Sequence, residues 1–124
     1  MTMINAGSAG STLPTERSAL TAASCMFRSL GDPTRLAILQ QLTLGEHKVV
    51  DLTAHLGLAQ STVSAHLACL KDCGLVESRP VGRASVYSLA RPELIGLLSA
   101  AETLLAATGD AVVLCPEYGE EAAP

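Results

Sequence analysis

The sequence has few aromatic residues and no long apolar run. Its 124 residues include no Trp, one Phe and two Tyr, so the core must be built mainly from aliphatic side chains, which favours close-packed helices. No segment approaches the roughly 18 apolar residues of a membrane span. The first twelve residues, MTMINAGSAGST, have neither the basic start nor the apolar centre of a signal peptide. We therefore expect one cytoplasmic domain with no membrane partner, after a flexible tail over residues 1–14.

Basic residues are also scarce, but they are unevenly placed. Eight Lys and Arg face twelve Asp and Glu, for a net charge of −4. Residues 61–91 nevertheless carry four basic and two acidic side chains, whereas residues 92–124 carry six acidic and no basic ones. A locally basic centre is compatible with DNA binding. No nucleophile paired with a base and no phosphate-binding loop is recognisable, so we do not expect an enzyme.

Apolar residues recur every three or four positions along much of the chain, as they do on one face of a helix. The motif GDPT interrupts this pattern, and Asp32 followed by Pro33 is typical of a helix start. Gly45 and Gly74 are typical of helix ends. Helices are expected at residues 15–30, 33–44, 49–56 and 61–73, and from Pro92 onward.

The third and fourth predicted helices are joined by the short turn GLAQ, the spacing of a helix-turn-helix. Alternating residues at 75–79 and 84–89 then predict two strands with a turn at 80–83. A hairpin in this place is the wing of a winged helix. We therefore predict a mainly α fold with a small β-hairpin, a winged helix-turn-helix over residues 15–108, and a C-terminal tail at 109–124. The apolar surface of the first and last helices predicts a homodimer formed through them.

The second helix of such a motif enters the major groove of DNA and presents short polar side chains to bases and phosphates. The helix at 61–73 begins with such side chains, and the wing turn carries an arginine that would reach a phosphate or the minor groove. Ser61 has the alternative role of a helix cap. The predicted contacts with double-stranded operator DNA are Gln60, Ser61, Thr62, Ser64, Ala65, His66 and Arg83.

Four cysteines are notable in a chain whose thiols are expected to stay reduced. Cys69 and Cys73 lie about 40° apart around the fourth predicted helix, to one side of its apolar stripe. They are either small packing residues or half of a metal site. Soft ions prefer three or four sulfur donors, and Cys115 is the third candidate, unless it is an ordinary residue in a flexible end. Cys25 is expected to pack in the core or at the dimer interface.

Three segments resemble the ArsR/SmtB family of winged-helix repressors: LGDPTRLAILQQL, VVDLTAHLGLAQSTVSAHLACLKDCGLV and GRASVYSLA. The resemblance covers roughly residues 20–106. It implies a homodimer that represses its own operon and releases DNA when a metal or metalloid binds. In cadmium- and lead-sensing members, two cysteines at the end of the recognition helix match Cys69 and Cys73. A third, in the tail of the other subunit, matches Cys115 by position only. The resemblance thus implies Cd(II) or Pb(II) as the inducer.

Other interpretations stay open. As(III), Sb(III) or thiol oxidation could be the signal, although helical cysteines four apart are poorly placed for a direct disulfide. His66 could serve as a spare nitrogen ligand, although DNA contact suits it better. The protein could instead be a structural Zn(II) module that mediates dimerisation. Such a module should unfold when the metal is removed, whereas an apo-sensor should stay folded and bind DNA.

Overall fold

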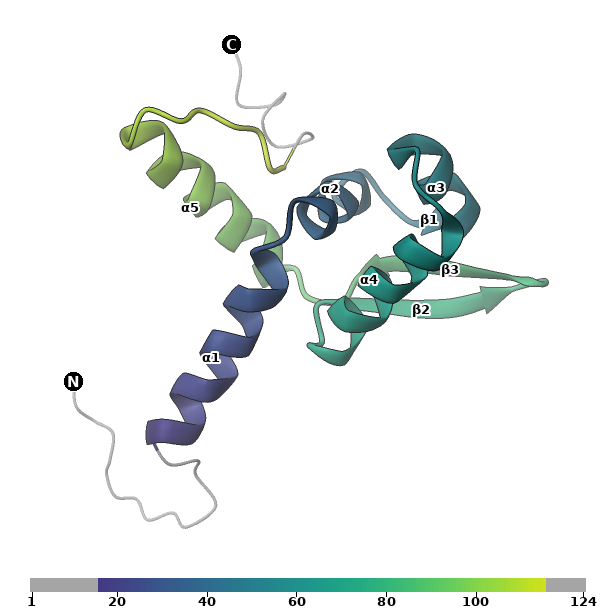
Figure 1. The fold of residues 1–124 in the computed structure, drawn as a ribbon, viewed down its shortest axis with the longest axis horizontal. Helices are drawn as coiled ribbons and strands as arrows, with labels where there is room; N and C mark the ends of the chain where they lie inside the picture. Colours follow the sequence, from purple (N-terminus) through teal and green to yellow (C-terminus); the bar gives the residue numbers. More distant parts are fainter. Residues whose placement is uncertain (1–15, 116–124) are drawn as a thin grey trace.

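The computed structural model describes residues 16–115 (Figure 1). The tail predicted at residues 1–14 lies outside this range. Within it, helices and strands follow the order α1 (Glu16–Leu30), α2 (Pro33–Leu42), β1 (His47–Lys48), α3 (Val49–Leu56), α4 (Gln60–Asp72), β2 (Val76–Val81), β3 (Ala84–Leu89) and α5 (Glu93–Ala107). This is the predicted winged helix-turn-helix, with one additional strand.

Short-range signals place the helix ends close to where the sequence predicts them. The Asp32 carboxylate accepts a hydrogen bond of 3.0 Å from the backbone N–H of Arg35, so Asp32 is the N-cap of α2 as predicted. Gly57 ends α3 in the left-handed conformation, with φ of 68°, which glycine adopts without a steric penalty. The predicted alternative of Ser61 as a cap is wrong, because α4 begins one residue earlier and its N-cap is Ala59.

The wing is longer than predicted and its turn is tighter. β2 runs through Pro80 to Val81, which pairs with Ala84, so the turn is Gly82 and Arg83 rather than residues 80–83. A proline fits this strand because the sheet order is β1-β3-β2, which makes β2 an edge strand. β1 was not predicted. It pairs its two residues with Tyr87 and Val86 of β3, and two residues are too few to show an alternating pattern.

The core lies between α2, α3, α4, the sheet and the start of α5. Val63, Leu67 and Leu70 form the predicted apolar stripe of α4, and each is fully buried. The other buried residues of this cluster are Ile38, Leu39, Leu42, Leu52, Leu75, Val76, Leu94, Leu98 and Cys115. Because α4 is fixed along this stripe, its other faces have defined directions relative to the domain.

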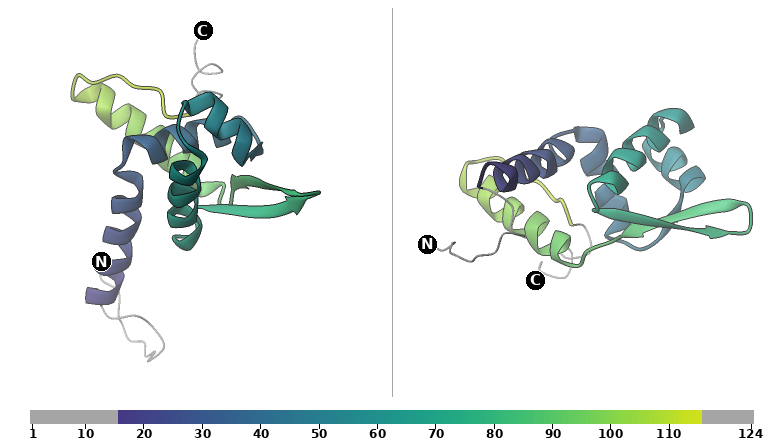
Figure 2. Two further views of the ribbon diagram at one scale, coloured as in Figure 1. Left: turned by 45° about the vertical axis from the view of Figure 1, so that its right-hand side comes forward. Right: turned by 90° about the horizontal axis from the view of Figure 1, so that it is seen from below.

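The helices α1 and α5 extend from the domain on the side away from the wing (Figures 1 and 2). Leu20 and Phe27 of α1 are 63% and 59% exposed, and Leu104 of α5 is 66% exposed. Both helices therefore leave apolar surface uncovered in the single chain. None of the helices in residues 16–115 is both long enough and apolar enough to cross a membrane.

Candidate DNA interface and thiol site

The first turns of α4 present the predicted DNA contacts to solvent. Because the stripe that begins at Val63 faces the core, the opposite side of the helix faces outward. His66 is half-buried, and Arg83 is exposed in the wing turn. The remaining predicted contacts are all exposed, and they are Gln60, Ser61, Thr62, Ser64 and Ala65.

Part of this set is gathered in one groove between α4 and the wing. Gln60, Ser64 and Arg83 line the groove, together with Lys48 at the end of β1. Lys48 is a basic residue that sequence reasoning missed. It reaches the groove because β1 pairs with β3 and brings Lys48 opposite Val86, a long-range contact that has no local signal. The groove thus brings the cationic side chains of Lys48 and Arg83 together with the polar side chains of Gln60 and Ser64. This combination is suited to binding DNA phosphates.

Cys69 of α4 and Cys73, the C-cap residue directly after α4, lie on another side of the helix, against the end of α1. Both are half-buried. The hydroxyl oxygen of Ser29 lies 2.8 Å from the Cys73 sulfur and 3.7 Å from the Cys69 sulfur. Ser29 is itself buried, with 3% exposure. The spacing of four residues therefore brings both thiols to one buried hydroxyl, outside the apolar stripe that fixes the helix.

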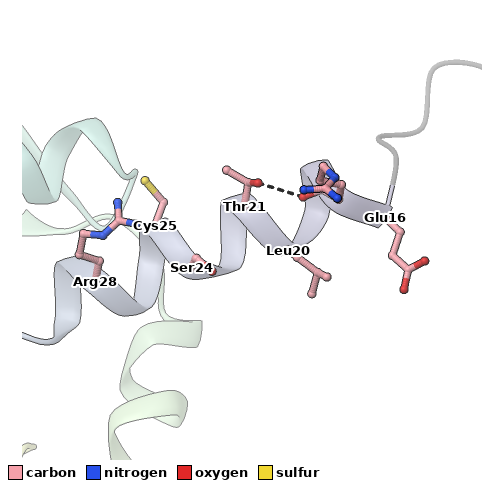
Figure 3. A pocket seen from close by; sticks show the side chains of 7 residues that line it. Glu16, Leu20, Thr21, Ser24, Cys25 and Arg28 are labelled. Carbon is pink, nitrogen blue, oxygen red and sulfur yellow. Dashed lines mark hydrogen bonds between the residues drawn. The ribbon is translucent and has the colours of Figure 1, made fainter.

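Cys25 lines the same groove as Cys69 and Cys73 but is exposed. The expectation that it packs in the core is therefore wrong, while a place at a dimer interface stays a prediction. In Figure 3 the Cys25 side chain projects from one side of α1 and the Leu20 side chain from the other, and both residues line one pocket. Arg28 lines the groove together with Cys25.

Cys115 is fully buried, so it is not the ordinary residue of a flexible end that the sequence left open. The segment after α5 turns back toward α2 (Figure 1), where the Gln40 side chain donates to the carbonyl of Val113 at 2.5 Å. The Glu102 carboxylate accepts hydrogen bonds from the backbone N–H groups of Leu114 and Cys115, at 2.5 and 2.6 Å. The Cys115 thiol donates to the carbonyl of Ile95 at 3.6 Å.

The surroundings of Cys115 disfavour its thiolate. Burial raises the pKa of the Cys115 thiol, and the nearby charge of Glu102 raises this pKa further. Within residues 16–115, no three His, Cys, Asp or Glu side chains lie close enough together to hold a metal ion. A single chain therefore does not bring Cys115 to Cys69 and Cys73, and Cys115 must leave its buried position before it can act as a ligand.

His66 is held by α2 rather than by the thiols. The Arg35 side chain donates from Nε to His66 Nδ1 at 3.1 Å, and the Asp32 carboxylate lies 3.9 Å from the same nitrogen. The backbone N–H of Arg35 is the main cause of the lowered pKa of Asp32. Because Nδ1 accepts from Arg35, this nitrogen is not available as a metal ligand in the observed arrangement.

Comparison with known proteins identifies the fold and the family. The family model "Bacterial regulatory protein, arsR family" matches residues 32–78. The chain is 40% identical over 98 residues to the "Probable mercury resistance operon repressor" of Streptomyces lividans, covering 77% of this chain and 78% of that protein.

Two solved structures extend this result. The solution structure of the cadmium sensor CmtR from Mycobacterium tuberculosis is 44% identical, with a TM-score of 0.54, over 62% of this chain and 80% of that one. The second is the solution structure of a homodimeric winged helix-turn-helix domain from Mycobacterium bovis, described as a possible ArsR-family regulator. It is 29% identical, with a TM-score of 0.67, and the match covers 75% of this chain and 88% of that one. The chain belongs to the arsR family of bacterial regulatory proteins, which are DNA-binding transcriptional regulators.

Proposed function

We propose that this protein is a metal-responsive transcriptional repressor that binds operator DNA as a homodimer in the cytoplasm and releases it when a soft metal ion binds its cysteines. The observation that carries the proposal is the position of Cys69 and Cys73. They lie in the last turn and at the C-cap of α4, the helix whose first turns present the polar side chains predicted to contact DNA. Ligation at one end of this helix can change its position or rigidity directly.

The homodimer is supported by the uncovered apolar surface of α1 and α5 and by the homodimeric relative. A two-fold dimer would place two copies of α4 and two wings on successive turns of DNA. Lys48 and Arg83 would neutralise phosphates at the edge of each site, while the start of α4 would lie in the major groove.

Cd(II) or Pb(II) is the inducer that we propose, with Cys69, Cys73 and Cys115 as its ligands. Thiolates suit these soft ions, and the cadmium sensor CmtR is among the similar proteins. Cys115 would come from the partner subunit after leaving its contacts with Glu102 and Ile95. Binding would release the thiol protons to solvent. A trithiolate site with a divalent ion carries a net charge of −1, which is unfavourable beside DNA phosphates.

Two alternatives use the same thiols. Hg(II) is favoured by the name of the Streptomyces lividans relative, and As(III) by its preference for three sulfur donors. A structural Zn(II) module is the third alternative, and it predicts that the apo-protein is unfolded. Neither Cys69 nor Cys73 is among the buried residues of the core that α2, α3 and α4 form. Because this core does not need the metal site, we expect the apo-protein to be folded.

The test is an anaerobic Cd(II) titration of the reduced full chain bound to its own upstream DNA. The thiolate-to-metal ultraviolet band and the DNA anisotropy are recorded together. We expect DNA release as the band saturates in the wild type. Cys73→Ser should lose most of the band, and Cys115→Ser should show a weaker band with poor release.

Cys25→Ser is the matched control, because Cys25 lines the same groove but is not one of the proposed ligands. It should behave as the wild type. If Cys25→Ser weakens the band and Cys115→Ser does not, the third ligand is Cys25. If DNA stays bound while the band saturates, Cd(II) is not the inducer, and the titration is repeated with Pb(II), Hg(II) and As(III). Unfolding of the apo-protein would instead support the structural zinc module.

A further inference from the structure

A chain of hydrogen bonds and close contacts links Cys69 and Cys73 to the side of α4 predicted to face DNA, through a residue of α2. The Ser29 hydroxyl lies against the sulfurs of Cys69 and Cys73. The backbone carbonyl of the same Ser29 accepts a hydrogen bond of 3.4 Å from Nη1 of Arg35. The Nε of Arg35 donates to His66 Nδ1 at 3.1 Å. Arg35 therefore contacts the end of α1 with one nitrogen and the recognition helix with another.

The chemistry of the guanidinium makes this contact directional. Its nitrogens lie in one rigid plane, so a shift of the carbonyl at Nη1 changes the direction of the Nε–H bond. Arg35 is half-buried and also donates to the carbonyl of Arg28 at 3.4 Å, which ties it to the last turn of α1. Because Nδ1 of His66 accepts a hydrogen bond, a neutral ring carries its proton on Nε2. Arg35 thus fixes both the orientation and the tautomer of His66.

A metal ion bound to both sulfurs would compete with the Ser29 hydroxyl for space. Metal–sulfur bonds are short, about 2.3 Å for zinc, while the hydroxyl oxygen lies 2.8 Å from one sulfur and 3.7 Å from the other. An ion bound to both sulfurs would lie in the groove that Ser29 also lines, and it would compete with the hydroxyl for its contact with the sulfurs. Ser29 is in the last turn of α1, one residue before Leu30, and its hydroxyl ties this turn to the sulfurs of Cys69 and Cys73. Loss of this contact would free the turn, and with it the carbonyl that holds Arg35, to shift.

We propose that Arg35 is the positioning residue that couples the thiol site to DNA recognition. In the apo-protein it holds His66 in the orientation that contacts DNA. Inducer binding at Cys69 and Cys73 displaces Ser29, withdraws the carbonyl that holds Arg35, and frees the His66 ring. This inference rests on the proposed function, since it explains how ligation at the end of α4 changes the exposed face at its start.

The test measures coupling, which is the ratio of the DNA dissociation constants of the full-length dimer with and without saturating Cd(II). Arg35→Lys keeps the positive charge but loses the planar pair of donors. We expect this variant to bind Cd(II) as the wild type does, by the ultraviolet band, and to show a coupling ratio at least about fivefold smaller. Arg28→Lys is the control, because Arg28 lines the same groove and only its backbone carbonyl contacts Arg35.

A second readout needs no DNA. The ¹⁵N NMR signals of the His66 ring report its tautomer, and we expect protonated Nε2 in the apo-protein. Saturating Cd(II) should shift these signals in the wild type, whereas Arg35→Lys should already show the shifted signals without metal. Ser29→Ala, which removes the hydroxyl but keeps the carbonyl, should bind Cd(II) more tightly with a reduced coupling ratio.

The outcomes separate this inference from the proposed function. If the wild type binds Cd(II) and releases DNA, and Arg35→Lys releases it by the same factor with an unchanged His66 spectrum, the inference is overturned while the proposed function stands. If the wild type shows no thiolate band or no DNA release with any of Cd(II), Pb(II), Hg(II) and As(III), the proposed function itself fails. An equal loss of coupling in Arg28→Lys would show that the effect is not specific to Arg35, and this would also overturn the inference.

Discussion

The carboxylate of Glu102 is one of the groups that hold Cys115 in its buried position, and this gives a quantitative prediction. Glu102 accepts the backbone N–H groups of both Leu114 and Cys115. A hydrogen bond to a charged group contributes about 1.5 kcal/mol or more, so Glu102→Ala removes about 3 kcal/mol from the free energy that holds this segment closed. Since 1.4 kcal/mol is a factor of ten, the open population rises by up to about 100-fold. Water replaces part of the lost interaction, so we expect at least about a tenfold increase.

The assay follows the reaction of Cys115 with a thiol reagent in a chain that also carries Cys25→Ser, Cys69→Ser and Cys73→Ser. A fully buried thiol reacts only when its segment opens, so the rate reports the open population. The loss of the Glu102 charge also removes one of the causes of the raised pKa of Cys115, which acts in the same direction. Glu93→Ala, an exposed glutamate at the start of α5, is the control and should not change the rate. An unchanged rate in Glu102→Ala would refute the reasoning.

Three further predictions concern stability, DNA binding and pH. Gly57→Ala should lower the free energy of unfolding by about 1–2 kcal/mol, because the backbone at this position is left-handed. Gly96→Ala, inside α5 with open space around it, should raise the free energy of unfolding by about 1 kcal/mol. Urea denaturation with equal slopes measures both changes, and changes of the same sign would contradict this reasoning. Lys48→Ala and Arg83→Ala should each weaken binding to every DNA sequence tested and reduce the slope of log affinity against log salt by about 1. A loss of affinity confined to DNA with one particular base at one position would contradict the proposed contact with phosphates. The pKa of Asp32 is lowered in the folded chain, so the stabilising effect of the Asp32 carboxylate should be complete above pH 3.8, its ordinary pKa, and should disappear as the pH falls through the folded pKa. The difference in urea midpoint between the wild type and Asp32→Asn should therefore be present at pH 7 and shrink in acid.

The order of helices and the face of α4 were predictable because they depend on residues within about four positions of each other. The stripe of Val63, Leu67 and Leu70 is periodic, and each residue is buried as the period requires. The cap at Asp32 bonds a backbone group only three residues away. The same short range brings Cys69 and Cys73 to one side of α4, which made them candidates from spacing alone.

The tertiary structure decided which distant groups meet. The Ser29 contact with the thiols spans 40 and 44 residues, the Arg35 contact with His66 spans 31, and the Gln40 contact with Val113 spans 73. The burial of Cys115, the exposure of Cys25 and the place of Lys48 beside the wing likewise follow from how α1, β1 and the segment after α5 pack. The sequence by itself determined the helices, the wing and the candidate thiol pair, because periodicity and caps are local. Only the packing of remote segments determined what those thiols touch, since nothing within a few residues of Cys69 or His66 specifies Ser29 or Arg35 as a partner.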